Sequence, residues 1–168
     1  FHYQKGVLEL LQIWKSVCKR IPQAKLAMVG LGPLESEIRR VITKLELHQN
    51  IELLGYKDGL EKYNIFKQSK IVVHPATFDS GGMAAAEAMA WGLPAVGFDL
   101  KALKTYYPKG MLKTKCFERE EFAENINQLL SNTVLYDKLS QSALDLIRRE
   151  WEWDTQAKNI FNRTFGNS

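Results

Sequence analysis

The stretch KLAMVGLGP, at residues 25–33, joins a short apolar run to a glycine-rich turn. Four consecutive apolar residues closed by Gly30-Leu-Gly-Pro33 are typical of a buried strand that runs into a tight turn. Helical periodicity flanks this stretch, at residues 7–20 before it and at 34–45 after it. A buried strand between two helices predicts an α/β fold.

The same alternation of strands and helices continues to residue 117. We expect strands at 51–54, 71–74, 94–98 and 110–114, helices at 60–68 and 82–91, and then helices only, at 118–130, 133–150 and 154–165. This order predicts right-handed βαβ units in a mostly parallel sheet. The predicted fold class is therefore α/β, a Rossmann-like parallel sheet with flanking helices and a helical C-terminus.

Length and composition limit the class of protein. A chain of 168 residues, 45% hydrophobic and 25% charged, fits a single globular domain, and no apolar run is long enough to span a membrane. We therefore expect a soluble, cytoplasmic protein. Cys18 and Cys116 have no ligand-like spacing to each other or to the histidines, which favours reduced core thiols. A net charge of +4 favours an anionic ligand but is too small to indicate nucleic acid.

Ligands of an open parallel sheet bind where the loops leave the carboxyl ends of the strands. Three such loops stand out by residue type, at residues 30–33, 54–56 and 74–82. The third leads into a helix that starts with Gly81 and Gly82, where free backbone N–H groups and the helix dipole would favour a phosphate. The alternative is an ordinary turn in which Asp79 or Ser80 caps the helix.

Glu87 is the only charged residue between Asp79 and Asp99, and its neighbours are alanines, methionines and a tryptophan that look buried. An unpaired buried carboxylate is costly. We therefore expect Glu87 to accept hydrogen bonds from the vicinal hydroxyls of a ribose. A partly exposed glutamate, or one paired with a lysine elsewhere in the fold, is the alternative.

Lysines occur at two places that bear on anion binding. Lys5-Gly6 directly precedes the first helix, so Lys5 would lie at the mouth of the same crevice if a strand precedes it, and it could neutralise a diphosphate without a metal. A plain surface lysine is the alternative. The stretch 101–115 holds five lysines and no acid, which favours a solvated rim over an anion-facing or membrane-facing edge.

A dinucleotide cofactor is disfavoured. Gly30 and Gly32 match part of the dinucleotide fingerprint, but the third glycine is absent. The next strand ends in Gly55 and Tyr56 rather than in a ribose-binding carboxylate.

Several segments, in order along the chain, are similar to the motifs of one family. Lys5-Gly6 is similar to its Arg-x4-Lys-Gly loop, residues 26–34 to its LxivGxGP strand and turn, residues 51–56 to its vxflGy strand, and residues 151–154 to its sWe element. The most specific match is to its Glu-x7-Glu signature, here Asp79 and Glu87 followed by Ala-Met-Ala-Trp-Gly-Leu-Pro94. Over nearly its whole length, the chain resembles the C-terminal, donor-binding domain of the retaining glycosyltransferases of family 4 (group 1), which have the two-Rossmann GT-B architecture.

The resemblance implies two catalytic residues. Lys5 would offset the charge of the departing diphosphate. Asp79 stands where the family has the first glutamate of its signature, which contacts hydroxyls of the donor sugar, and it is shorter by one methylene. The remaining matched positions would bind the donor through the ribose, the distal phosphate and the base, at Glu87, Gly81, Gly82, Met83, Gly30, Gly32, Gly55 and Tyr56.

The resemblance also implies the reaction. A sugar would pass from a nucleoside-diphosphate donor to an acceptor hydroxyl with retention at the anomeric carbon, and the leaving diphosphate would be stabilised electrostatically, with no metal or other cofactor. A sugar or lipid-linked acceptor would bind to a missing N-terminal domain. The first strand of the donor-binding domain would be missing too. Residues 1–168 alone should therefore be inactive. A lipid acceptor would bring the protein into peripheral contact with a membrane.

Three alternatives stay open. A sugar-nucleotide epimerase would also bind a diphosphate here, although the residues after Glu87 favour the transferase. A non-catalytic doubly wound binding module predicts acidic or phosphorylatable residues at the strand ends, where this chain has glycines and Pro75. A transferase relative that has lost its activity would carry Asp79 as the mark of that loss.

Overall fold

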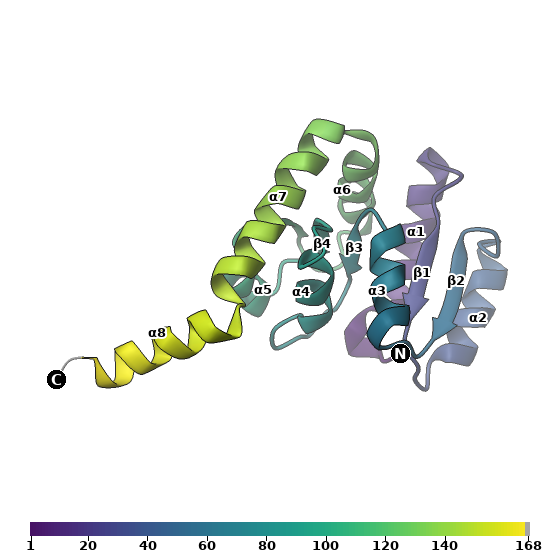
Figure 1. The fold of residues 1–168 in the computed structure, drawn as a ribbon. Coiled ribbons are helices and arrows are strands. Elements are labelled where there is room, and N and C mark those ends of the chain that lie inside the picture. Colours follow the sequence, from purple (N-terminus) through teal and green to yellow (C-terminus); the bar gives the residue numbers. More distant parts are fainter. Residues whose placement is uncertain (167–168) are drawn as a thin grey trace.

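The structure, a computed structural model, describes residues 1–166, without the side chains of residues 153 and 155. All the strand pairs in this part of the chain are parallel (Figure 1). One sheet has the order β1-β2 and the other has the order β3-β4-β5. The strands are β1 (Leu26–Val29), β2 (Ile51–Gly55), β3 (Val72–His74), β4 (Ala95–Phe98) and β5 (Met111–Thr114).

The predicted fold class is confirmed, with one difference in the sheet. The sequence predicts one mostly parallel sheet, whereas β1 and β3 are not hydrogen-bonded to each other and the strands form two sheets. The core nevertheless runs across this break, because a single hydrophobic cluster includes Met28 of β1 together with Val96 and Phe98 of β4.

Seven helices lie where the sequence predicts them, with ends that differ by no more than a few residues. They are α1 (Val7–Arg20), α2 (Glu35–Lys44), α3 (Gly59–Gln68), α4 (Met83–Met89), α6 (Arg119–Ser131), α7 (Thr133–Glu150) and α8 (Trp153–Phe165). Two short helices are not predicted, η1 (Tyr3–Lys5) and α5 (Lys101–Tyr106). Leu103 and Tyr107 of the lysine-rich stretch are fully buried, whereas Lys101, Lys104, Lys109 and Lys115 are exposed, so the lysines do form the predicted solvated rim.

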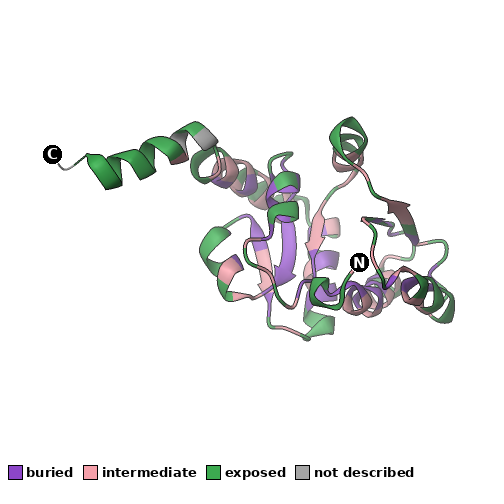
Figure 2. Ribbon diagram, turned by 90° about the horizontal axis from the view of Figure 1, so that it is seen from below, coloured by how far each residue is buried: buried purple, intermediate pink, exposed green. Residues whose placement is uncertain are grey.

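The larger core lies between α1, α6 and the strands (Figure 2). Leu11 and Val17 on the apolar face of α1 share this core with Phe122 and Ile126 of α6, and all four are fully buried. Phe98 of β4 meets the Phe122 ring edge-on, with 5.0 Å between the ring centres. A fully buried side chain of this size contributes about 1.5–3 kcal/mol to the free energy of folding.

A second core fixes the position of α4. Ala85, Ala86 and Met89 of α4 pack with the buried Tyr107 and with Leu146 of α7. Small side chains on the inner face of α4 let the helix lie close against its neighbours. The start of this helix is therefore held by the core on its inner side.

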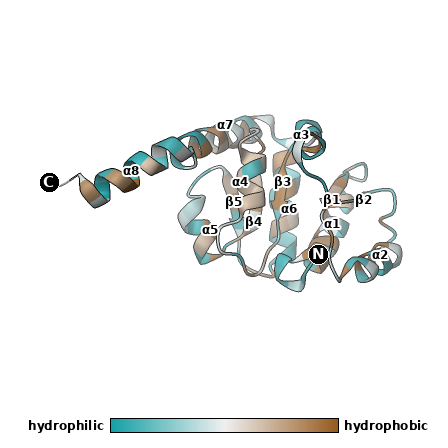
Figure 3. Ribbon diagram, turned by 60° about the horizontal axis from the view of Figure 1, so that its bottom comes forward, coloured by the Kyte–Doolittle hydropathy of each residue, from teal (hydrophilic) through white to brown (hydrophobic). Residues whose placement is uncertain are grey.

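α8 continues from α7 and extends away from the rest of the chain (Figures 1 and 3). Its Ile160, Phe161 and Phe165 are each more than 60% exposed. Within the described residues, no helix is both long and apolar enough to cross a membrane. The side chain of Trp153, part of the predicted sWe element, lies outside the described residues.

The cysteines are both free. Cys18 and Cys116 are half-buried at the edge of the larger core rather than inside it, so the prediction of core thiols holds only in part. Burial raises the pKa of both thiols, and this disfavours the reactive thiolate.

Candidate functional site

Lys5 and Asp79 meet at the carboxyl end of β3. The Lys5 ammonium lies 2.7 Å from Oδ2 of Asp79, although the two residues are 74 positions apart in the chain. Backbone hydrogen bonds hold the two segments together, because the Gln4 carbonyl accepts from the N–H groups of Thr77, at 2.9 Å, and of Phe78, at 3.3 Å. Lys5 therefore contacts the loop at which the sequence predicts a ligand, and its place at the mouth of a donor crevice stays a prediction.

Asp79 fills the place at which the sequence predicts a phosphate. Its Oδ1 accepts hydrogen bonds from the N–H groups of Gly81, at 3.1 Å, and of Gly82, at 2.9 Å. Its side chain is only 8% exposed. Burial alone would raise the pKa of Asp79, but the Lys5 ammonium and the two N–H groups outweigh this effect and lower it. Asp79 therefore closes the turn that precedes α4, as in the alternative of an ordinary turn, but the N-cap residue of the helix is Gly82, for which no side-chain cap bond is formed.

Tyr107 is a residue of this cluster that the sequence analysis missed. Its fully buried hydroxyl donates to the carbonyl oxygens of Gly81, at 2.7 Å, and of Gly82, at 2.9 Å. The ring stacks on Trp151 with 5.6 Å between centres. Burial and the nearby Asp79 carboxylate raise the pKa of Tyr107, so the hydroxyl keeps its proton. Tyr107 therefore binds the carbonyl groups of the same two glycines whose N–H groups bind Asp79.

His74 is a second missed residue. It is the last residue of β3 and is 7% exposed. Its Nε2 lies 3.3 Å from Oδ2 of Asp79. Burial lowers the pKa of His74, and the Asp79 carboxylate opposes this effect. A histidine at the end of a strand beside a candidate ligand loop was the available signal in the sequence.

Glu87 is not buried, so the expectation of a buried carboxylate is wrong, while its predicted contact with a ribose stays a prediction. Its side chain is 45% exposed, and its Oε2 lies 2.9 Å from the ammonium of Lys62 on α3. The reason is that α4 is amphipathic: Ala85, Ala88 and Met89 are buried, while the opposite face, with Glu87, is exposed. The alternative of a glutamate paired with a lysine elsewhere in the fold is confirmed.

Other predicted donor-binding residues lie around the ends of β1 and β2. The Gly30 N–H donates to the Gly55 carbonyl over 2.8 Å, which joins the two turns. Tyr56 is 66% exposed and Met83, at the start of α4, is 60% exposed, so both side chains are open to a ligand. Gly32 precedes α2, and its carbonyl accepts from the N–H of Glu35 at 3.2 Å.

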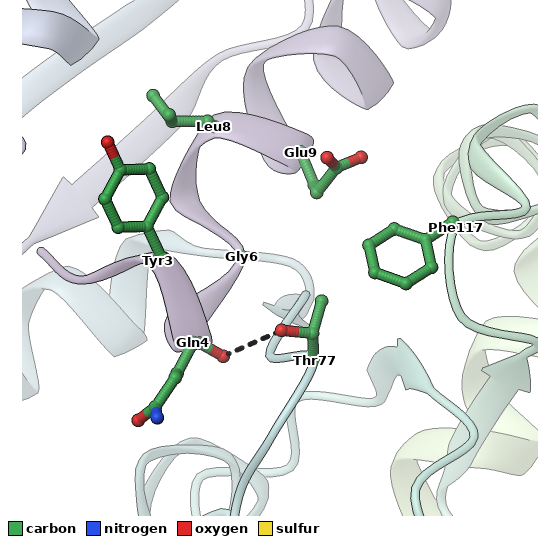
Figure 4. Close-up of a pocket in the computed structure, with 7 residues that line it drawn as sticks. All are labelled: Tyr3, Gln4, Gly6, Leu8, Glu9, Thr77 and Phe117. Atoms are coloured by element: carbon green, nitrogen blue, oxygen red, sulfur yellow. Dashed lines mark hydrogen bonds between the residues drawn. The ribbon is translucent and has the colours of Figure 1, made fainter.

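Two hollows flank the Lys5–Asp79 pair. One, of about 410 Å³, lies between η1, the start of α1 and the loop after β5, and is lined by Tyr3, Gln4, Gly6, Leu8, Glu9, Thr77 and Phe117 (Figure 4). The other, also of about 410 Å³, lies between the β3–α4 loop and α5, and is lined by Asp79, Ser80, Lys101, Ala102, Thr105 and Tyr106. Both hollows are next to loops that leave the carboxyl ends of strands, where ligands of such sheets bind.

Comparison with known families shows to which family the chain belongs. The family described as "Glycosyl transferases group 1" matches residues 1–145. The chain belongs to the group 1 glycosyltransferases. The matched range contains the whole Lys5, His74, Asp79 and Tyr107 cluster, and α8 lies beyond it.

Curated relatives of this group 1 glycosyltransferase domain are similar over most of the chain. The amylovoran biosynthesis glycosyltransferase AmsD of Erwinia amylovora is 27% identical over 162 residues, which cover 89% of the chain and 44% of the relative. A GDP-mannose-dependent monoacylated alpha-(1-6)-phosphatidylinositol monomannoside mannosyltransferase of Corynebacterium glutamicum is 25% identical over 95% of the chain and 43% of its own length. The chain thus spans less than half the length of these relatives.

Solved structures show the same fold. HepE of Anabaena in complex with UDP-glucose superposes with a TM-score of 0.85 at 20% identity, over 98% of this chain and 46% of that one. The C-terminal domain of the group 1 family protein LpcC of Francisella tularensis gives a TM-score of 0.81 at 19% identity, over 91% of this chain and 83% of that one. The fold is therefore that of the C-terminal domain of GT-B glycosyltransferases.

Replacing Tyr107 with phenylalanine tests how the loop of this glycosyltransferase domain is held. The change removes the donor to the Gly81 and Gly82 carbonyls and keeps the ring stacked on Trp151. We expect the free energy of unfolding to fall by about 1–2 kcal/mol, because buried acceptors lose their partner. Urea unfolding measures this loss. Tyr136→Phe is the control, since no hydrogen bond of its hydroxyl occurs within the described chain, and an equal loss in both variants would contradict the expectation.

Proposed function

We propose that this domain binds a nucleoside-diphosphate sugar and, together with a second domain, transfers the sugar to an acceptor hydroxyl with retention of configuration. The observation that carries the proposal is the contact of Lys5 with Asp79 over 2.7 Å. It brings a cation and a carboxylate from two motifs of the group 1 family to one loop at the carboxyl end of β3. Transfer from a nucleoside diphosphate needs a positive charge at the leaving group, and Lys5 supplies one without a metal.

Binding of the donor would exchange internal contacts for contacts with the ligand. The distal phosphate would take the N–H groups of Gly81 and Gly82, which now serve Asp79, and it would draw the Lys5 ammonium toward itself. Asp79, once released, would be available to a hydroxyl of the donor sugar. The ribose would take Glu87 from Lys62, an exchange between partly exposed groups that costs little.

The base would lie at the ends of β1 and β2. Gly55 leaves space there, since a Cβ atom at this position would meet nothing within 4 Å, and Gly30 is in no tight contact, whereas Gly32 lies against the backbone of Phe1. The exposed ring of Tyr56 offers a surface on which a base can stack. The Corynebacterium glutamicum relative is GDP-mannose-dependent, and Anabaena HepE binds UDP-glucose. The proposal therefore covers both bases and leaves the choice to experiment.

We propose further that the active enzyme has an N-terminal domain that binds the acceptor, and that a parallel strand preceding Phe1 fills the space between β1 and β3. In support, the chain covers less than half of its relatives, and β1 and β3 each have one unpaired edge within the described sheets. A cytoplasmic location, with peripheral membrane contact when the acceptor is a lipid, is part of the proposal. The inactivity of the domain alone follows from it.

Calorimetric titration with UDP, GDP and ADP tests the donor site. We expect one of the three to bind, and Glu87→Gln to weaken its binding about tenfold to a hundredfold, because charged hydrogen bonds to the ribose are lost. Glu61→Gln is the matched control, since Glu61 also forms an exposed ion pair, 3.0 Å from Lys57, but on α3. If none of the nucleotides binds to the full-length protein, or if both variants bind equally well, the proposed donor site is wrong.

A further inference from the structure

His74 has no role in the proposed transfer, yet it lies beside Asp79 at the end of β3, where a functional residue is expected. The ring is nine-tenths buried at the end of β3, and no hydrogen bond to Nε2 with acceptable geometry occurs within the described residues. Oδ2 of Asp79 lies 3.3 Å from this nitrogen. A buried polar atom without a partner is costly. This atom lies just short of a hydrogen bond to the carboxylate that Lys5 also contacts.

The Asp79 carboxylate has two basic neighbours of different kinds. Lys5 is 57% exposed in its side chain and can move toward a ligand, whereas the His74 ring is fixed in the core. Both nitrogens face the same oxygen, Oδ2. If Lys5 leaves, a carboxylate that is only 8% exposed loses its cation, and the nearest group that can replace it is His74.

The other elements around the ring contribute few charges. Tyr107, next to the Asp79 loop, has an uncharged hydroxyl. β4 places Gly97 beside His74, and the buried face of α4 carries only alanine and methionine. The charge state of His74 is therefore governed by burial, by Asp79 and by Lys5, as the causes of its lowered pKa indicate.

We propose that His74 is a positioning residue which takes up a proton and replaces Lys5 as the partner of Asp79 when a nucleoside diphosphate binds. The proton comes from the solvent and goes to the imidazole, and no covalent bond of the ligand changes. The protonated ring donates to Oδ2 and keeps the carboxylate in place while Lys5 faces the diphosphate. This inference rests on the proposed donor site and extends it to His74, which is not part of the sequence motifs that contain Lys5 and Asp79.

The direction of the pH effect follows from linkage. The departure of Lys5 and the arrival of an anion both favour the protonated imidazole, so the pKa of His74 is higher in the complex than in the free protein. The complex then holds more protons than the free protein. We expect the affinity to be greatest at low pH and to fall, by up to about tenfold per pH unit, as the pH rises between the free and bound pKa values.

Calorimetry in buffers of different ionisation enthalpy tests the proton uptake, with UDP as the probe, or with GDP or ADP if one of these binds instead. We expect the uptake of up to one proton per nucleotide in the unchanged protein, and no uptake in His74→Gln, which should still bind. His48→Gln, a change at an exposed histidine, should behave like the unchanged protein. Binding without proton uptake would overturn the role of His74 and leave the donor site intact, whereas the absence of any binding would count against the donor site itself.

A second measurement needs no nucleotide. NMR titration of the His74 ring in Lys5→Met should give a higher pKa than in the unchanged protein, because the competing cation is removed while Asp79 stays. An equal pKa of His74 in the two proteins would overturn the proposal. This test does not depend on the His74→Gln variant, so it holds even if that variant does not fold.

Discussion

Replacement of Gly6 by alanine is expected to lower the free energy of unfolding by more than about 3 kcal/mol. Gly6 has a φ of +63°, and a Cβ atom at this position would lie 1.8 Å from the carbonyl oxygen of Pro75. The oxygen belongs to the backbone, so it cannot move aside as a side chain could. Either η1 must separate from the β3–α4 loop, or the loop itself must shift. Urea unfolding, followed by circular dichroism, measures the loss.

Gly55→Ala is the matched control for this change. Gly55 has a similar φ of +69°, but a Cβ atom there would meet nothing within 4 Å. It should therefore show only the cost of a left-handed backbone, about 1–2 kcal/mol. Equal losses in the two variants would mean that the close approach of Gly6 to Pro75 is not what requires glycine. A larger loss for Gly6→Ala would explain why glycine follows Lys5, since any side chain would push the lysine away from Asp79.

The second large effect is expected from Lys5→Met in the full-length enzyme. Methionine keeps much of the length of the side chain and removes the charge that we assign to the leaving diphosphate. We expect the rate of sugar transfer to fall on the order of 10²–10³-fold, which is typical when one preorganised electrostatic group is lost. Since the Lys5 side chain is 57% exposed, the fold should lose little stability. A coupled assay of nucleotide release with the physiological donor measures the rate.

Two further variants make the Lys5 experiment decisive. Lys5→Arg keeps the charge and should retain more activity than Lys5→Met. Lys19→Met removes an exposed lysine at the end of α1, far along the helix from η1, and should leave the rate unchanged. A fall of less than about threefold in Lys5→Met would be small against the range expected for such a group and would exclude Lys5 from the chemistry.

The helices and strands were predictable because their burial is periodic. α1 presents Leu11, Trp14 and Val17 on one face, and this pattern requires no knowledge of the partner. The same reasoning failed at Glu87, where a run of alanines looks apolar on every side. Alanine tolerates both burial and exposure, so the side of α4 that faces the solvent depends on which helices lie next to it.

The site was predictable only where a motif marks it. Lys5 and Asp79 stand in recognisable positions, and their contact is present in the structure. Tyr107 and His74 carry no such mark, because their roles depend on which residues the fold brings within 3.3 Å. The sequence allows Asp79 either to bind the N–H groups of its own loop or to point toward a ligand, and the first arrangement depends on the loop conformation, which no motif specifies.

The pairing of α1 with α6 sets the order in which this domain can be built during synthesis. The Glu9 carboxylate accepts from Arg119, 110 positions later, over 2.5 Å, and Ser16 donates to Glu120 over 2.8 Å. The apolar face of α1 finds its main partner only when Phe122 and Ile126 have been made. A nascent chain in which α6 has not yet been synthesised therefore exposes the apolar face of α1. Chaperones are expected to bind this face until the ribosome has synthesised α6.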